Sequence, residues 1–419
     1  MIVRNEEELL PRCLESVRGI VDEMVVCDTG SQDGTAAIAR EAGARLVEFA
    51  WCDDFSAARN YALAQTRGDW ILHLDADEVL LPGARPAIEE ALAGTHAGHL
   101  LPLENLLDEE GRLVRQTTHL LRLFRNLSAV RYRGRVHEQV SLEEHGLTIG
   151  HCAARIRHDG YLNARVAARD KHGRNLRLLE AALAEAPDDL YALYQRGKTL
   201  FAMDRTVEAG PSIEEVIGRL EKTVHPERLA YAPRPFLQRA QIAETGGLAH
   251  AIPWIERGLA LLPGSAELWL RFGLYCHRAG RDSEAQAAWI RSEELAPHAD
   301  AAAQAAQAGG DLLVQQGRFL EAAAAYGRVV QHAPREFTTW LRLANALLQA
   351  GERTQAIAAY EEVLTREPAE PAAALALGTL YFEQGERRRA LVAFETAART
   401  YQSPELLQLI ELCRASSGP

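Results

Sequence analysis

Two carboxylates stand directly after a short apolar run, and their spacing suits a divalent metal ion. Asp75 and Asp77 are separated by one small residue and follow the run Trp-Ile-Leu-His-Leu at residues 70–74. Mg²⁺ and Mn²⁺ bind through one or two carboxylates and keep positions open for phosphate oxygens. We therefore predict that these residues hold Mg²⁺ or Mn²⁺ together with a phosphorylated substrate. An acidic pair of this kind can alternatively form a cap or a solvated turn.

Other polar residues could reach the same substrate. Asp28 ends a second short apolar run and precedes a polar turn at residues 29–35. Asp28 could accept hydrogen bonds from a nucleotide base or ribose, whereas side chains of the turn could merely cap the following helix. Arg59 stands near a predicted helix start, where it could contact a bound anion. Arg122 and Arg125 could contact phosphate or simply be solvated.

The apolar runs that precede these acidic residues predict strands of an α/β sheet. A run such as residues 70–74 fits a strand that is covered on both faces. The segment after Asp28 predicts a helix over residues 36–41. In open α/β sheets, ligands bind beyond the carboxyl ends of the strands. Because Asp28, Asp75 and Asp77 would stand at such ends, the pattern predicts a nucleotide-binding edge.

The composition is that of an ordinary globular protein and argues against some partners. The chain has 419 residues, enough for two or more domains, and is 47% hydrophobic and 25% charged. A net charge of −12 without a basic stripe argues against nucleic-acid binding. The six cysteines lack the close spacing of zinc or redox motifs, which favours buried, reduced thiols. With no signal peptide or membrane-spanning run, we expect a cytoplasmic protein; peripheral association with a membrane stays open.

The second half of the chain repeats with a period of about 34 residues. A glycine is followed five residues later by alanine and nine residues later by an aromatic residue, starting at Gly280, Gly317, Gly351 and Gly385. This pattern is typical of tetratricopeptide repeats, each of which is a pair of helices. We predict an all-α array over residues 187–415 with six helix pairs, the first two irregular. A capping helix is expected from Pro404 to Ala415.

The N-terminal motifs, taken in order, resemble those of the family-2 glycosyltransferases with the A-type fold. The resembling stretches are residues 1–7, 28–31, Trp51 with 53–56 and 58–60, 74–78, 134–139 and 158–161. The similarity is greatest to the bacterial branch that carries tetratricopeptide repeats, related to lipooligosaccharide glucosyltransferases and peptide S-glycosyltransferases. The resemblance implies a Rossmann-like α/β nucleotide-sugar-binding domain at residues 1–180. Members usually have several more apolar residues before the position of Met1, so we expect a trimmed first strand or a misplaced start.

The resemblance also implies roles for individual residues. Asp77 would carry the metal, and Asp75 would orient ribose or share the ion. His158 matches a histidine that often completes the metal or diphosphate site in this fold. Glu138 would take the proton of the attacking acceptor.

Structural alternatives stay open for two of these residues. Glu138 could instead pair with Arg133 or Arg135, and His158 could have a purely structural role. Within the predicted site, Asp28 would read the base and Arg59 would steady the diphosphate.

The expected function is transfer of a hexose, with inversion, from a nucleotide sugar to a protein, peptide or glycan acceptor. UDP-glucose is the expected donor, and the array would bind a polypeptide acceptor or another partner. One alternative is a peptide-binding scaffold whose N-terminal domain is catalytically inactive. A second, a nucleotidyltransferase, lacks support because no Gly-rich, Lys-containing phosphate loop opens the chain.

Overall fold

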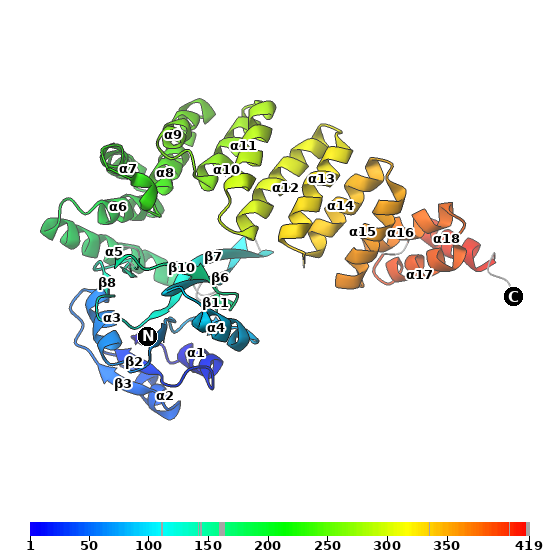
Figure 1. Ribbon diagram of the computed structural model, residues 1–419. Coiled ribbons are helices and arrows are strands. Elements are labelled where there is room, and N and C mark those ends of the chain that lie inside the picture. Colours follow the sequence, from blue (N-terminus) through cyan, green and yellow to red (C-terminus); the bar gives the residue numbers. More distant parts are fainter. Residues whose placement is uncertain are drawn as a thin grey trace. The chain divides into compact units, whose positions relative to one another are not determined.

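The chain folds into two compact units. The computed structural model describes residues 1–109, 112–140, 142, 145–158, 164–334, 336–401 and 403–415. The units are Met1–Ser212 and Ile213–Pro419. All strands of the described residues belong to the first unit, and the second is built from helices (Figure 1).

The first unit begins with alternating strands and helices and ends with long helices. Its elements are β1 (Ile2–Val3), α1 (Leu10–Val17), β2 (Val25–Asp28), α2 (Thr35–Glu41), β3 (Arg45–Glu48), α3 (Phe55–Ala64), β4 (Trp70–Leu72), β5 (Glu78–Leu80), α4 (Ala84–Ala93), β6 (Gly98–Glu109), β7 (Arg112–Arg125), β8 (Tyr132–Arg133), β9 (Gln139–Val140), β10 (Ile149–His151), β11 (Ile156–His158), α5 (Ala164–Glu185) and α6 (Leu190–Ala202).

The strands form a parallel sheet, a mixed sheet and a short ribbon. The parallel sheet has the order β1-β2-β3, and the mixed sheet has the order β4-β7-β6-β11-β5, with β10 paired to β6. The ribbon pairs β8 with β9. In the mixed sheet, Leu101, Leu123 and Ile156 from neighbouring strands pack with Ile88 of α4 in one apolar core. This sheet brings segments distant in sequence to the ends of β4 and β5.

The helix and the strand predicted near the acidic edge both form, with small changes in their bounds. The helix expected at residues 36–41 is α2, which begins one residue earlier. The strand expected at residues 70–74 is shorter, because β4 ends at Leu72. His73 N still donates to the Arg122 carbonyl at 2.7 Å, and the chain then turns, with Glu78 N donating to the Asp75 carbonyl at 3.0 Å. The turn places both aspartates beyond the strand.

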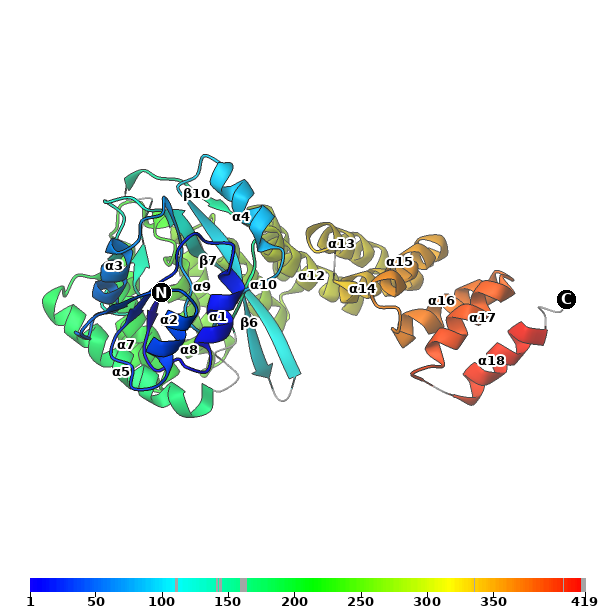
Figure 2. The ribbon, with the colours of Figure 1, turned by 90° about the horizontal axis from the view of Figure 1, so that it is seen from below.

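The remainder of the chain is a succession of helices. After α7 (Thr206–Leu220), which crosses the boundary between the units, and a short 3₁₀ helix at Pro226–Arg228, the second unit consists of α8 (Pro233–Glu244), α9 (Leu248–Leu261), α10 (Ala266–Arg278), α11 (Asp282–Leu295), α12 (Ala299–Gln315), α13 (Phe319–His332), α14 (Phe337–Gln349), α15 (Arg353–Arg366), α16 (Pro371–Glu383), α17 (Arg387–Ala397) and α18 (Pro404–Ala415). Figure 1 shows α8 to α17 as successive pairs, and Figure 2 shows α12 to α17 from below.

The helix pairs confirm the predicted repeats. Gly317 and Gly351 end the first helix of their pairs with positive φ angles of 71° and 82°, a conformation that glycine adopts without strain. Gly378 lets two helices approach closely, since a β-carbon there would lie 2.5 Å from the Phe394 ring. Helices α6 and α7 take the place of the first predicted pair, and α18 is the predicted capping helix. The helices α7 and α9 of the first two pairs each contain a proline, Pro211 and Pro253.

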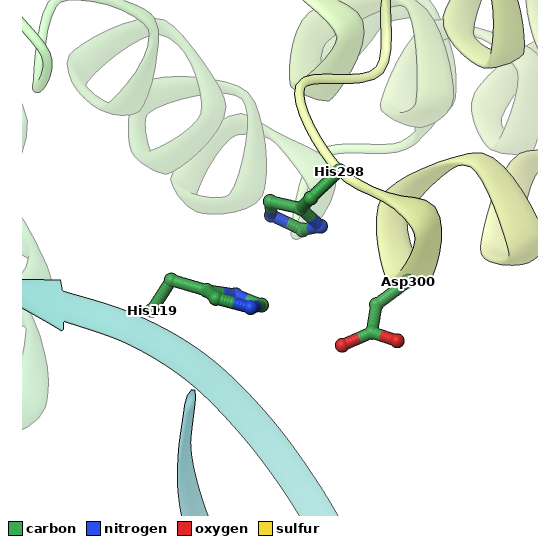
Figure 3. Close-up of side chains that lie close together, drawn as sticks. All are labelled: His119, His298 and Asp300. Carbon is green, nitrogen blue, oxygen red and sulfur yellow. The ribbon is translucent and has the colours of Figure 1, made fainter. Parts of the chain in front are cut away.

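Helix α12 begins with a histidine cap. The backbone N–H of Ala301 donates to His298 Nδ1 at 3.2 Å, and Asp300 stands in the first turn (Figure 3). Figure 3 also draws His119 of β7, which belongs to the first unit. A carboxylate in the first turn interacts favourably with the positive end of the helix dipole, so His298 and Asp300 both stabilise the start of α12.

The expectation of buried, reduced cysteines is confirmed for five of the six. All six cysteines are free, and five are buried as expected. Cys52 is exposed, because it lies in the loop before α3 rather than in an element of the core.

No helix in the described part of the chain has both the length and the apolar character needed to cross a bilayer.

Candidate active site

Two buried arginines hold Asp75 just beyond β4. Arg59 Nη2 donates to Asp75 Oδ1 at 3.0 Å, and Arg122 Nη2 donates to Oδ2 at 3.3 Å. The arginine side chains are 11% and 10% exposed, whereas that of Asp75 is 34% exposed. Burial opposes ionisation of Asp75, but the two guanidinium charges hold the pKa of its carboxyl well below the ordinary value. Asp75 is therefore an anion shared between two cations.

Arg122 is not a solvated residue. It is buried and pairs with Glu78 as well as with Asp75, so the solvated alternative from the sequence is wrong. Burial raises the pKa of Glu78 to about 7, an effect that Arg122 opposes and neighbouring carboxylates reinforce. Arg125 instead stacks on the Trp70 ring, 4.6 Å from its centroid.

His73 lies between the same two arginines and was not assigned a role from the sequence. Its Nδ1 is 2.9 Å from Arg122 Nη1, and its Nε2 faces Arg59. Burial and the two guanidinium charges lower the pKa of His73 well below its ordinary value, so the ring is neutral. The signal in the sequence was a histidine within the otherwise apolar run at residues 70–74.

Arg59 also reaches Glu138, which lies far away in the sequence. Its Nε donates to Glu138 Oε1, so that one guanidinium contacts both Asp75 and Glu138. The sequence left open a pairing of Glu138 with Arg133 or Arg135. Arg135 pairs with Glu185 instead, so this alternative is wrong for Arg135. Arg59 thus joins two of the predicted site residues.

Helix α3 is fixed so that Arg59 can reach these partners. Its N-terminus is capped by Asp54, which accepts a hydrogen bond from Ala57 N at 2.9 Å. The Asn60 side chain donates to the Tyr132 carbonyl at 2.9 Å and accepts from Tyr132 N at 2.8 Å. The cap fixes the start of α3, and the two hydrogen bonds of Asn60 hold the helix against β8.

The segment that carries Glu138 is supported by the helices that follow the sheets. Val136 is buried in a cluster with Leu178 and Leu179 of α5 and Ala192 of α6. The Gln139 side chain also donates to the Tyr191 hydroxyl at 2.7 Å. The start of the helical region therefore forms part of the structure that holds Glu138.

Asp77 pairs with His158 rather than with an arginine. His158 Nε2 is 3.0 Å from Asp77 Oδ2, and His158 Nδ1 is 2.9 Å from Asn105 Oδ1. Burial opposes protonation of His158, but the hydrogen bond and charge of Asp77 raise its pKa above the ordinary value. The sequence motif ends at residues 159–161, which lie outside the described residues.

The donor set of Asp77 and His158 fits a divalent ion. Neighbouring ligands in an octahedral shell with bonds of about 2.1 Å lie about 3 Å apart. The oxygen and nitrogen 3.0 Å apart match this spacing. Carboxylate and imidazole together suit Mn²⁺ at least as well as Mg²⁺. In the described part of the chain, ligand atoms of Asp75, Asp77 and His158 do not all lie within 4.8 Å of one another.

Asp28 ends β2 and organises the turn that follows it. Its Oδ1 accepts hydrogen bonds from Gly30 N at 3.0 Å and Ser31 N at 2.8 Å, and its side chain is buried. The turn is stitched to the loop after β1, because Gln32 N donates to Asn5 Oδ1 at 2.8 Å. Ser31 accepts from the Asn5 backbone N–H at 3.0 Å, so its hydroxyl joins the two loops instead of capping α2.

Both the α/β domain and the helical repeat array match families of known proteins. Residues 1–157 match the family described as Glycosyl transferase family 2. Residues 308–371 and 347–413 match two models of the tetratricopeptide repeat. The first part of the chain is thus similar to the family-2 glycosyltransferases and the last part to tetratricopeptide repeats, which confirms the resemblance and the fold class predicted from the sequence.

Several known proteins are similar to parts of the chain. A TPR repeat-containing protein of Synechococcus elongatus is 42% identical over 48% of this chain and 51% of its own length. The SPbeta prophage-derived glycosyltransferase SunS of Bacillus subtilis is 27% identical over 53% of each protein. An uncharacterised glycosyltransferase of Rickettsia felis is 37% identical over 22% of this chain and 32% of its own length. The chain thus spans about half the length of the first two relatives.

One solved structure that matches part of the chain is that of YrrB, described as a TPR protein with an unusual peptide-binding site. It is 15% identical, with a TM-score of 0.38, over 48% of this chain and 97% of its own.

Proposed function

We propose that the chain is an inverting glycosyltransferase that moves a hexose from a nucleotide sugar, with UDP-glucose as the expected donor, to a protein, peptide or glycan acceptor. The family of the N-terminal domain supports the class of reaction. The observation that carries the proposal is the contact of one guanidinium, that of Arg59, with both Asp75 and Glu138. It brings the predicted donor-binding edge and the predicted base together.

The donor would lie along the carboxyl ends of β2 and β4. Asp28 would accept hydrogen bonds from the base or ribose there, and Asp75 would orient the ribose or share the ion. Mg²⁺ or Mn²⁺ held by Asp77 and His158 would neutralise the charge that builds on the diphosphate leaving group. Arg59 would contribute its positive charge to the same diphosphate.

Glu138 would act as the general base. In the transfer step, the acceptor oxygen or sulfur forms a bond to the anomeric carbon as the bond from that carbon to the diphosphate oxygen breaks. The acceptor proton goes to Glu138, and the nucleoside diphosphate leaves. Oε1 of Glu138 accepts from Arg59, so Oε2 would receive the proton. Direct displacement inverts the anomeric centre.

The repeat array would recruit the acceptor or an assembly partner. Stacked tetratricopeptide pairs present extended surfaces that suit polypeptides. An array of over 200 residues would be superfluous for a free small sugar, which favours a polypeptide.

A donor panel tests the proposed function. The full chain is incubated with UDP-, GDP- and dTDP-sugars and Mn²⁺, and release of the nucleotide is followed with and without candidate peptides. We expect slow release from UDP-glucose that EDTA abolishes. Failure of every donor to bind or release nucleotide would overturn the proposal, and retention at the anomeric centre of a product would overturn inversion.

A further inference from the structure

We propose that Asn105 is a positioning residue for His158: its amide oxygen accepts the Nδ1 hydrogen, and Nε2 is thereby kept available as a metal ligand beside Asp77. This inference rests on the proposed metal-assisted function. It adds a residue that none of the sequence motifs includes.

The sheet fixes the position of Asn105 relative to His158. β11 runs parallel to β6, with His158 directly opposite Asn105, and antiparallel to β5, with His158 opposite Glu78. The ring is therefore flanked by strands on both sides. Its Nδ1 lies 2.9 Å from Asn105 Oδ1, while Nε2 lies 3.0 Å from Asp77 Oδ2.

The two ring nitrogens then have different roles. A neutral imidazole carries a hydrogen on one nitrogen and a lone pair on the other. Without metal, Nε2 carries a hydrogen toward Asp77, because a carboxylate can only accept. When a metal ion takes the place of that hydrogen, an amide oxygen opposite Nδ1 keeps the remaining hydrogen on Nδ1 and leaves the Nε2 lone pair to the ion. If the amide nitrogen of Asn105 faced Nδ1 instead, the ring hydrogen would sit on Nε2 and block that ligand.

Residues that orient a metal-binding histidine in this way typically change metal affinity by about 10- to 100-fold when they are removed. Asn105→Ala should therefore weaken Mn²⁺-dependent UDP binding at least about tenfold. Asn105→Asp keeps an oxygen opposite Nδ1 and should retain the affinity. Asn345→Ala is the matched control, because Asn345 also accepts a side-chain hydrogen bond, from the Tyr360 hydroxyl at 2.6 Å, in the repeat array. It should leave UDP binding unchanged.

The position of the ring hydrogen gives a readout that does not depend on activity. In ¹⁵N-labelled full-length protein at alkaline pH, long-range ¹H–¹⁵N spectra report the hydrogen position on each histidine, and loss of signals in His158→Gln assigns His158. With Mg²⁺ and UDP added, we expect hydrogen on Nδ1 alone in the wild type and a mixture of tautomers in Asn105→Ala. Hydrogen on Nε2 of the wild type with Mg²⁺ and UDP, or an unchanged tautomer in Asn105→Ala, would overturn the inference.

Calorimetry separates failure of this inference from failure of the proposed function. If wild-type UDP binding depends on Mn²⁺ and Asn105→Ala binds equally well, only the positioning role of Asn105 is overturned. If wild-type binding is the same in EDTA and in Mn²⁺, the metal-assisted function is overturned, and the ligand role of His158 is overturned with it.

Discussion

Asp75 and Asp77 belong to one short motif, yet their surroundings differ. Their side chains are similarly exposed, at 34% and 31%, so the contrast lies in their partners. Asp75 is held by Arg59 and Arg122, whereas Asp77 faces His158. Two cations already neutralise the first carboxylate, and the second is paired with a group that can itself bind metal. The comparison teaches that the two acidic residues of such a motif need not share one role.

The arginine-held side of the site is built for rigidity. Arg59, Arg122 and His73 surround Asp75, and Glu78 accepts a hydrogen bond from Asp75 N at 3.0 Å. Loss of one member would leave other buried charges without compensation. On the other side, Asp77 faces an imidazole, a group that can itself bind a metal ion.

The largest expected effect breaks this comparison directly. Asp77→Asn should remove the Mn²⁺ dependence of UDP binding and reduce transfer by about a thousandfold, because the leaving-group charge loses its stabilisation. Calorimetry with UDP in Mn²⁺ and in EDTA measures the binding, and nucleotide release measures the rate. A variant that still binds UDP more tightly with Mn²⁺ would contradict the ligand role of Asp77.

Asp75→Asn is the matched variant for Asp77→Asn. Because two buried guanidinium groups would lose a shared carboxylate, its free energy of unfolding should fall by about 2 kcal/mol, a value reduced for the partial exposure of Asp75. Asp77→Asn should change that free energy little. Equal losses of stability in urea denaturation would remove the distinction between the two aspartates.

The next effect concerns Glu138 alone. Glu138→Gln should reduce transfer by about a hundredfold, or about 3 kcal/mol, and leave Mn²⁺-dependent UDP binding unchanged. Glu185→Gln is the control, because Glu185 is 66% exposed and pairs with Arg135 away from the reacting groups. Near-normal turnover of Glu138→Gln would mean that another acidic residue within residues 96–175 is the base.

The sequence predicted the residues whose roles depend on local patterns. Asp28 and Asp75 follow apolar runs, and turns after strands can be recognised from nearby residues. The repeats were equally accessible, because a period of about 34 residues persists from Gly280 to Gly385. Local patterns are enough to place these elements.

Partners brought together by the sheets could not be read in this way. The sequence offered Arg133 or Arg135 as alternative partners of Glu138, but its partner Arg59 is 79 residues away. Asn105 meets His158 only because β6 and β11 pair in one particular register. Strand order and register are set by packing of the whole domain, which the local sequence does not encode.

Truncation tests whether the repeat array has a role in transfer that the N-terminal domain lacks. A chain that ends at residue 220, after α7, should keep slow donor hydrolysis and lose transfer to a polypeptide acceptor by tenfold or more. A chain that ends at residue 186 should lose both, because Tyr191 and Ala192 of α6 no longer support the segment around Glu138. Equal hydrolysis by the two truncated chains would contradict this support, and undiminished transfer by the longer one would exclude the array from acceptor delivery.

The smallest expected effect is a pH dependence of the free energy of unfolding, which arises from His137, the residue before Glu138. Burial, with Lys198 and Lys171 nearby, lowers the pKa of His137 to about 4, from 6.5. The folded protein therefore binds fewer protons than the unfolded chain between these values, so stability is fully present above pH 6.5 and falls as the pH is lowered toward 4. Between pH 7.5 and pH 5 this histidine should account for about 2 kcal/mol of lost free energy of unfolding. His137→Asn, which tolerates the positive φ of 56° at this position, should lose correspondingly less stability in urea denaturation at pH 5. An unchanged difference between the two pH values would show that His137 is as accessible to protons in the folded protein as in the unfolded chain.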